Sequence, residues 1–329
     1  MEETPPVAEN IFQTAWRKLI EFFKLVGLAA KEFSADNALK FSASLSYYTL
    51  FSMAPMLIIV IAISSVWLGR EAAEGYLYTQ FEGLLGTVGA LQLQEMIRNA
   101  HVSGATPLAT GIGVATLIFG ATGVFLEIQD SINSIWSLKA KPKRGWLKFL
   151  QNRLLSFSLI VGIGFLLLVS LVLSAMLSII YEFLDQRIGD AAWLSWIITN
   201  VINLSTVVLL FAVVFKVLPD AKVKWRDVIT GALFTADLFI AGKWLINYYL
   251  SRSATMSVYG AAGAVVLIVL WIYYSSAILY FGAEFTKVYA NKYGHKIAPS
   301  SYAVFVEKKE VVTYDSAASI THPEVKKEL

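Results

Sequence analysis

The sequence predicts an all-α, polytopic transmembrane helical bundle with six spanning helices and both termini in the cytoplasm (N-in/C-in). Three observations lead to this prediction. Apolar residues make up 57% of the chain and charged residues only 16%, whereas about a quarter of the residues in a soluble domain are charged. Six segments are apolar over the roughly 20 residues that a helix needs to cross a bilayer. The loops between these segments are alternately rich and poor in lysine and arginine.

The six apolar segments account for most of the chain after residue 40. Because backbone N–H and C=O groups cannot remain unpaired in lipid, each segment is expected to be a helix. The third segment contains no charged residue at all. The predicted spans are Phe41–Leu68, Leu108–Trp136, Leu154–Tyr181, Trp193–Leu218, Val228–Leu250 and Tyr259–Tyr289.

The distribution of basic residues predicts the orientation, because cytoplasmic loops carry an excess of lysine and arginine. One set of loops is strongly basic, and the opposite set holds only Arg70, Arg98, Arg187 and Arg252. The basic set contains Arg17, Lys18, Lys24, Lys31 and Lys40, then Lys139, Lys141, Lys143, Arg144, Lys148 and Arg153, then Lys222, Lys224 and Arg226, and finally Lys287, Lys292 and Lys296.

Three parts of the chain are predicted. Residues 1–39 form a cytoplasmic N-terminal segment, in which an apolar stripe from Phe12 to Val26 indicates an amphipathic helix on the membrane surface. A soluble cap that packs on the loops is the alternative. Residues 40–290 form the membrane domain, with a long outer loop at 70–107 that is expected to contain one or two surface helices. Residues 291–329 lack periodicity and are expected to be a disordered cytoplasmic tail.

The sequence gives no support to an enzymatic function. It contains no nucleotide-binding loop, no dinucleotide fingerprint and no G-x-S-x-G elbow. It has no cysteine, and its three histidines, His101, His295 and His322, are far apart. We therefore expect that the protein is not an enzyme and that it binds no cofactor or metal.

Four acidic residues inside the predicted spans are the candidate transport-path residues, because charged groups in a membrane are costly and usually have a role. Glu127 and Asp130 share a face of the second span, Asp237 lies near the middle of the fifth, and Glu284 lies in the sixth, three residues before Lys287.

Structural roles are the alternative for these residues. Glu127 and Glu284 lie near the cytoplasmic ends of their helices, where they could reach the surface or pair with a basic loop residue such as Lys40, Lys139 or Arg153. Asp237 has no neighbour of this kind at helical spacing, since Lys243 is six residues away.

Hydroxyl residues and a proline distinguish the first span. Ser42, Ser46 and Thr49 form a polar stripe that is more typical of close helix packing than of a pore. Pro55 is expected to kink the same helix.

Four blocks in series span most of the chain from Lys40 to Ala290. They are ALKFSASLSYYTLFSMAPMLI, GATGVFLEIQDSINSIW, VLPDAKVKWRDVITGALFTADLFIAGKWLINYYL and SVYGAAGAVVLIVLWIYYSSAILYFGAEFTKVYA. Together these blocks resemble the YihY/BrkB family of bacterial inner-membrane proteins. In the fifth span, relatives often have Glu-x-x-Lys-Trp where this chain has Ala241-Gly-Lys-Trp244. The resemblance implies six spans in the bacterial cytoplasmic (inner) membrane. Members have carried ribonuclease and virulence-factor labels, and some have been suggested to be transporters.

Two functions follow as hypotheses. The first is a transporter or exporter of an unidentified small molecule or lipid, with a polar path between the first, second, fifth and sixth spans. The second is a non-transporting scaffold or envelope-assembly factor. A ribonuclease is disfavoured because no catalytic constellation is present, and the positive-inside rule already accounts for the basic loop Lys139–Arg153 without a nucleic acid partner.

Overall fold

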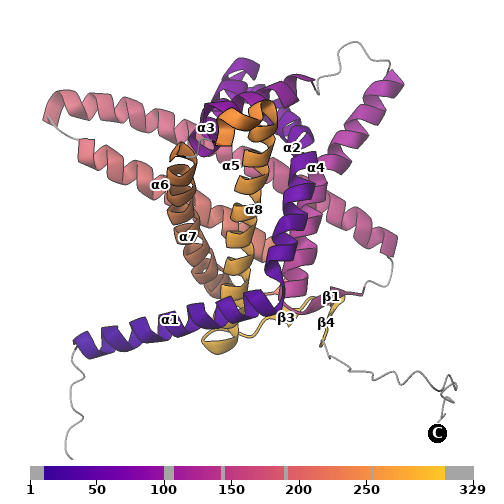
Figure 1. The fold of residues 1–329 in the computed structure, drawn as a ribbon, viewed down its shortest axis with the longest axis vertical. Helices are drawn as coiled ribbons and strands as arrows, with labels where there is room; N and C mark the ends of the chain where they lie inside the picture. The colour runs from indigo at the N-terminus through magenta and orange to yellow at the C-terminus, as the bar shows by residue number, and fades with distance from the viewer. Residues whose placement is uncertain (1–10, 100–106, 142–144, 189–191, 253–254, 308–329) are drawn as a thin grey trace, which may run out of the picture.

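The computed structural model describes residues 11–99, 107–141, 145–188, 192–252 and 255–307, and these are almost entirely helical (Figure 1). The helices are α1 (Ile11–Ala35), α2 (Ala38–Leu68), α3 (Arg70–Asn99), α4 (Pro107–Ile135), α5 (Gly145–Ile188), α6 (Ala192–Val217), α7 (Trp225–Arg252) and α8 (Thr255–Lys292). The short strands are β1 (Leu138–Ala140), β2 (Ala221–Lys222), β3 (Ala298–Pro299) and β4 (Ala303–Phe305).

Four helical stretches in the described residues are long and apolar enough to cross a membrane, and a bent pair in α2 makes a possible fifth. The four lie in α5, α6, α7 and α8. The predicted second span coincides with α4, where the side chains before Ala115 lie outside the described residues. The protein is therefore an α-helical membrane protein with four or five candidate spans, and the number six remains a prediction.

The predicted kink in the first span is confirmed. The two parts of α2, Ala38–Met53 and Pro55–Ile61, meet at an angle of 52°. Proline has no N–H to donate to the preceding turn, and its ring displaces the carbonyl four residues earlier. Gly120 of α4 lies against this bend, where an added Cβ would be 3.1 Å from Cγ of Pro55.

The two serines of the hydroxyl stripe of α2 are buried and Thr49 is half-buried, which favours the packing role over a pore lining. Ser42 and Ser46 are at most 3% exposed. Their hydroxyls donate to backbone carbonyls one turn earlier, at 3.0 Å to Ala38 and 2.8 Å to Ser42. Because both serine hydroxyls are satisfied within α2, neighbouring helices can pack directly against this face.

Helices α7 and α8 pack through two reciprocal glycine–threonine contacts. A Cβ on Gly231 would lie 2.8 Å from Cβ of Thr286, and a Cβ on Gly282 would lie 2.8 Å from Cβ of Thr235. The order of the contacts reverses along the chain, so the two helices are antiparallel. Each glycine lets the opposite backbone approach closely, as small residues do in membrane helix pairs.

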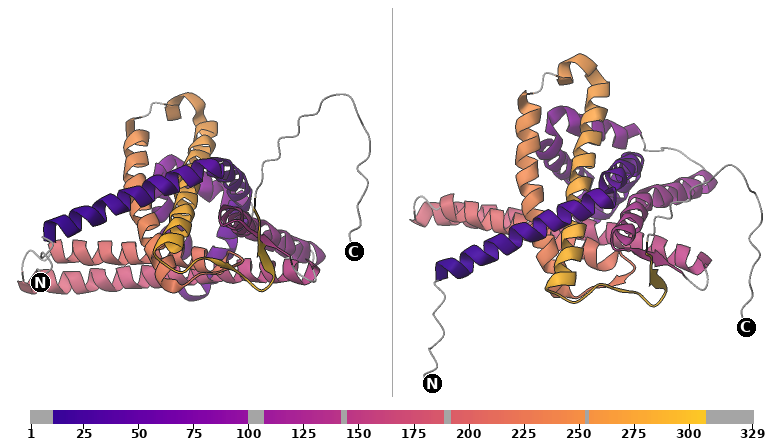
Figure 2. Two further views of the ribbon diagram at one scale, coloured as in Figure 1. Left: turned by 90° about the horizontal axis from the view of Figure 1, so that it is seen from below. Right: turned by 60° about the horizontal axis from the view of Figure 1, so that its bottom comes forward.

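The α5–α6 hairpin joins the core at one end, where Ile160 of α5 and Phe215 of α6 are buried. Figures 1 and 2 show its two helices side by side, projecting sideways from the upright α7–α8 pair. This differs from a bundle of six parallel spans.

The end of the molecule that carries the four strands and α1 is called the strand side below (bottom of Figure 1). There β1 pairs with β4 and β2 pairs with β3, both antiparallel. The prediction of a disordered tail is therefore wrong for residues 298–305, which donate to and accept from the loops after α4 and α6. Residues 308–329 of the predicted tail lie outside the described residues.

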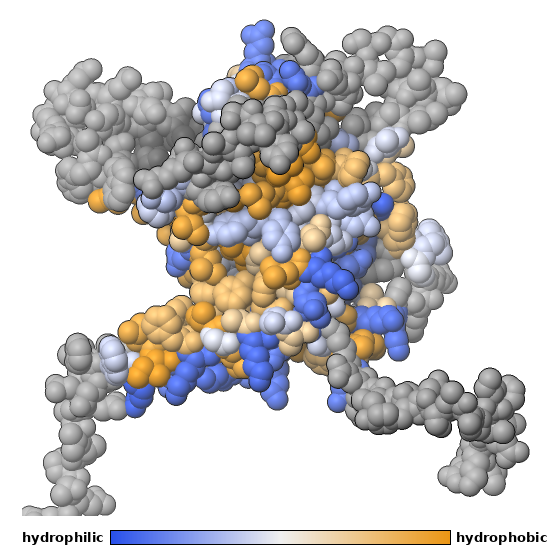
Figure 3. All heavy atoms as spheres, in the orientation of Figure 1, coloured by the Kyte–Doolittle hydropathy of each residue, from blue (hydrophilic) through white to orange (hydrophobic). Residues whose placement is uncertain are grey.

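Both the predicted outer loop and the N-terminal segment are largely helical. Helix α3 fills most of the 70–107 loop as one continuous helix. Helix α1 exposes Trp16, Leu19 and Phe23 on one face. Figure 3 shows apolar side chains along its upper edge and charged ones along its lower edge. Its contact with lipid stays a prediction.

Candidate functional site: a buried charge cluster between α1 and α8

Glu284 is the most deeply buried acidic residue of the described chain, with no exposed side-chain surface. It lies on α8, in the candidate span Val265–Lys292. Its Oε2 atom is 3.2 Å from Nζ of Lys287. Its Oε1 atom is also buried but has no hydrogen-bond partner among the described residues. An unsatisfied buried oxygen on a carboxylate is costly, so this site carries strain that a proton or another donor would relieve.

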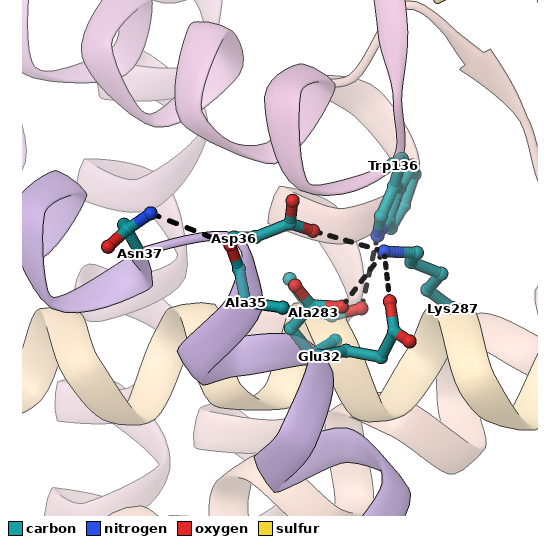
Figure 4. Close-up of polar contacts among 8 residues, drawn as sticks. Glu32, Ala35, Asp36, Asn37, Trp136, Ala283 and Lys287 are labelled. Atoms are coloured by element: carbon teal, nitrogen blue, oxygen red, sulfur yellow. Dashed lines mark hydrogen bonds and ion pairs between the residues drawn. The ribbon is translucent and has the colours of Figure 1, made fainter. Parts of the chain in front are cut away.

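The Lys287 ammonium is shared by three carboxylates. Besides Glu284, it donates to Oε2 of Glu32 at 3.3 Å and to Oδ2 of Asp36 at 3.2 Å. Figure 4 shows Lys287 reaching between Glu32 and Asp36 of α1. An ammonium has three donors, so it can serve each carboxylate once. If all four groups are ionised, the cluster carries two more negative charges than positive ones.

Local sequence places these four side chains together. Glu284 and Lys287 are three residues apart on α8, and Glu32 and Asp36 are four apart on α1, so each pair shares a helix face. Asn37, which lies between α1 and α2 and caps the start of α2, has a left-handed conformation with φ of 55°. Asparagine tolerates this conformation better than most residues, and it turns the chain sharply from α1 into α2.

Apolar contacts hold α1 in this position. Leu25 and Ala29 of α1 form a buried cluster with Phe285 and Val288 of α8. Nearby, the indole N–H of Trp136, at the end of α4, donates to the Ala283 carbonyl at 3.0 Å. These contacts fix the position of the charge cluster relative to α1, α8 and α4.

The carboxylate oxygens of Glu32, Asp36 and Glu284 lie within 4.8 Å of one another, which is close enough for a small cation. The Lys287 ammonium lies within 3.3 Å of all three residues. The cation of this cluster is therefore the lysine side chain.

Asp220 is a second buried acid at the strand side, in the loop after α6. Gln129 and Asn133 of α4 donate to its two carboxylate oxygens at 3.1 and 3.0 Å. Its backbone N–H donates back to Asn133 at 2.8 Å. Both carboxylate oxygens have partners, so this network joins α4 to the α6–α7 loop as a structural link.

Asp227 is a third buried acid, in the first turn of α7. It accepts the backbone N–H of His295 at 3.0 Å, and the His295 imidazole is 3.8 Å away. Its position in the first turn also suits a negative charge. Asp227 thus holds the chain that follows α8 against α7, again as a structural link.

The structure does not bring the four predicted site residues into one site. Glu284 pairs with Lys287, at the spacing noted in the sequence. Asp237 is exposed on the surface of α7 and lines a pocket under α1. Asp130 is exposed and lines a separate pocket beside β1, and Glu127 is half-buried on α4.

Sequence reasoning missed Glu32 and Asp36 of the cluster, and also Asp220 and Asp227. All four lie outside the predicted spans, or at their ends, where acidic residues are ordinary. The one available signal was the Glu32–Asp36 pair, which shares a face at the end of an otherwise basic helix.

Comparison with known proteins supports a membrane location. A 29% identical UPF0761 membrane protein of Azotobacter vinelandii aligns with 82% of this chain and 61% of its own length. A 28% identical UPF0761 membrane protein of Tolumonas auensis aligns with 80% of this chain and 87% of its own length. This chain thus spans less than two thirds of the Azotobacter relative. No solved structure matches the chain.

The family comparison covers nearly all of the structure described above. The family model for virulence factor BrkB matches residues 29–303, from the last turns of α1 to the first residue of β4. The matched range includes the whole Glu32–Asp36–Glu284–Lys287 cluster. Because the match extends over far more than half of the sequence, this chain belongs to the YihY/BrkB family of membrane proteins.

Proposed function

We propose that this protein is a transporter that moves a solute or lipid across the bacterial inner membrane and takes up and releases a proton at Glu284. The observation that supports this proposal most directly is the burial of Glu284 in a candidate span. One of its carboxylate oxygens has no hydrogen-bond partner among the described residues. Ionisable groups inside membrane helices typically serve proton or ion movement.

The charge balance of the cluster supports this proposal. Three carboxylates share one ammonium, and an excess of buried charge is costly in a medium of low polarity. A proton on Glu284 removes one negative charge and supplies a donor. Glu32, whose side chain is 40% exposed, gives the cluster a route to water.

Proton exchange would also change how α1 is held. Lys287 connects α8 to Glu32 and Asp36 of α1. With a proton on Glu284, the ammonium interacts mainly with α1. After the proton leaves, Glu284 competes for the ammonium and weakens that connection. A local charge change is thereby linked to the contact between two helices, which is how such switches bias a conformational equilibrium.

We further propose the six-span, N-in/C-in topology. Its support is that α1 and the strands after α8 lie at the same end of the molecule, the strand side (Figure 1). The basic loops of the sequence meet at this end, as expected for a cytoplasmic face. A reporter fused after Lys143 is expected to be cytoplasmic, and one fused after Gly86 is expected to be on the opposite side. Both reporters on one side would contradict the six spans.

The scaffold hypothesis has one observation in its favour. Helices α7 and α8 are packed so closely at Gly231 and Gly282 that no polar path can run between them at that level. The pocket at Asp237 lies on the surface of this pair that α1 covers, not between the two helices.

This arrangement also limits the path of a transporter. A transported substrate would have to move along the surface of α7 that lies under α1.

A transport assay separates the two hypotheses. The purified full chain is reconstituted in proteoliposomes and tested with small solutes and with fluorescent phospholipids, with and without an imposed proton gradient. We expect gradient-dependent movement of at least one substrate above the level of empty liposomes. Movement that equals that of empty liposomes for every probe would favour the scaffold.

A further inference from the structure

A pocket of about 330 Å³ lies between α1, α7 and α8 at the strand side. Its volume falls at the lower end of the range of small-ligand sites. Helix α1 crosses in front of the α7–α8 pair at this level (Figure 1). The residues that line it, all from these three helices or the turn after α8, are Lys18, Glu21, Phe22, Leu25, Thr230, Leu233, Phe234, Asp237, Phe285, Tyr289 and Tyr293.

The pocket walls are mainly aromatic. Phe234 and Phe285 stack with their ring centroids 3.9 Å apart. The Phe22 ring of α1 meets both of them edge-on, at 6.1 Å. Tyr289 stacks on Phe285 at 6.4 Å and extends the wall toward the end of α8. Faces of aromatic rings attract organic cations as well as apolar groups.

Charged side chains lie at the edges of this aromatic wall. Asp237 makes no hydrogen bond or ion pair with any described residue, although it lies in a candidate span. Glu21 accepts the Tyr293 hydroxyl at 3.2 Å. Lys18 supplies the basic group of the lining. The pocket therefore offers two acids and one base around an aromatic surface.

We propose that this pocket binds a phospholipid whose headgroup carries an ammonium next to its phosphate. The ammonium lies against the aromatic wall and Asp237, and Lys18 takes the phosphate. An unpaired carboxylate that faces lipid is costly, and a headgroup cation relieves that cost. This inference rests on the proposed function, since it names the substrate class that the transporter would move.

The surroundings favour a lipid over a free headgroup molecule of the same chemistry. Beyond Asp237, α7 exposes large apolar side chains on the way to its far end, namely Ile240, Trp244 and Leu245. Acyl chains can cover these groups while the headgroup occupies the pocket. A soluble ligand would leave them without a contribution to binding.

Native mass spectrometry of the purified full chain tests this assignment. The protein is mixed with equal amounts of phosphatidylethanolamine, which carries the ammonium, and phosphatidylglycerol, which does not. We expect preferential retention of phosphatidylethanolamine. Asp237→Asn is expected to reduce that preference about tenfold, or about 1.4 kcal/mol, because it removes the charge from the hydrogen bond to the ammonium.

Matched variants identify the role of each charge. Lys18→Met is expected to weaken both lipids together, because both carry the phosphate. Lys24→Met removes a lysine of the same helix that does not line the pocket, and is expected to change neither. Free phosphoethanolamine at the same concentration is expected not to displace the lipid.

Three results would overturn the inference: equal retention of the two lipids by the unmodified protein, an unchanged preference in Asp237→Asn, or full displacement by free phosphoethanolamine. The assay needs no gradient and no transport. A protein that selects the ammonium lipid without moving any substrate would contradict only the proposed function. Gradient-driven transport without lipid selection would contradict only the pocket assignment.

Discussion

Gly231→Ala and Gly282→Ala are each expected to destabilise the protein by about 3 kcal/mol, at the upper end for overpacking of a filled core. Each added Cβ would lie 2.8 Å from the Cβ of a threonine on the opposite helix, with the hydroxyl of that threonine closer still. The two backbones must then separate, and contacts along the whole α7–α8 interface weaken. Thermal unfolding of the detergent-solubilised protein measures the change.

Gly162→Ala is the matched control, because Gly162 also lies in a candidate span but has nothing within 4 Å of an added Cβ. It is expected to be neutral or slightly stabilising, since alanine favours helix. The double variant Gly231→Ala/Thr286→Gly removes the opposing side chain and should recover much of the loss. Equal melting temperatures for Gly231→Ala and Gly162→Ala would contradict the packing that we describe.

Lys287→Met is expected to cost about 3 kcal/mol, the lower end for breaking a buried ion pair. The change leaves the carboxylates of Glu32, Asp36 and Glu284 together without their ammonium. The partial exposure of Glu32 lets water screen some of the repulsion, which limits the loss. Thermal unfolding of the detergent-solubilised variant measures the loss of stability. Faster protease cleavage within α1 would show that α1 has been released from α8.

The neighbouring basic residue of α8 provides the control. Lys292 is exposed and contacts the Tyr293 ring, so Lys292→Met is expected to change stability by less than about 0.5 kcal/mol. Adding Glu284→Gln to Lys287→Met should restore part of the lost stability, because it removes one of the stranded charges. If Lys287→Met unfolds at the same temperature as Lys292→Met, the cluster does not hold α1 to α8.

Hydropathy and spacing predicted the features that depend on neighbouring residues. The apolar runs marked the helices of the membrane domain, Pro55 marked the bend in α2, and the three-residue spacing marked the Glu284–Lys287 pair. Each of these follows from local chemistry: the missing N–H of proline, or the shared face of residues three apart on a helix.

Features that depend on helix direction could not be predicted in this way. Glu32 and Asp36 meet Lys287 only because Asn37 adopts a left-handed conformation and α1 then lies across α8. The sideways course of the α5–α6 hairpin is set by packing, whereas hydropathy gives only length. The pairing of β4 with β1 joins segments far apart in the chain and too short to show a period of two.

Proton-driven transport by Glu284→Gln, compared with the unmodified protein, tests the central claim most directly. Glutamine keeps the size of the side chain and can still accept from Lys287, but it cannot bind or release a proton. Lys287 also keeps Glu32 and Asp36 as partners, so the variant should fold. In proteoliposomes with an imposed proton gradient, we expect the unmodified protein to move substrate faster with the gradient than without it. Glu284→Gln, at an equal melting temperature, should lose that acceleration. Full gradient-driven transport by a stable Glu284→Gln variant would contradict the proton-exchanging role of this cluster.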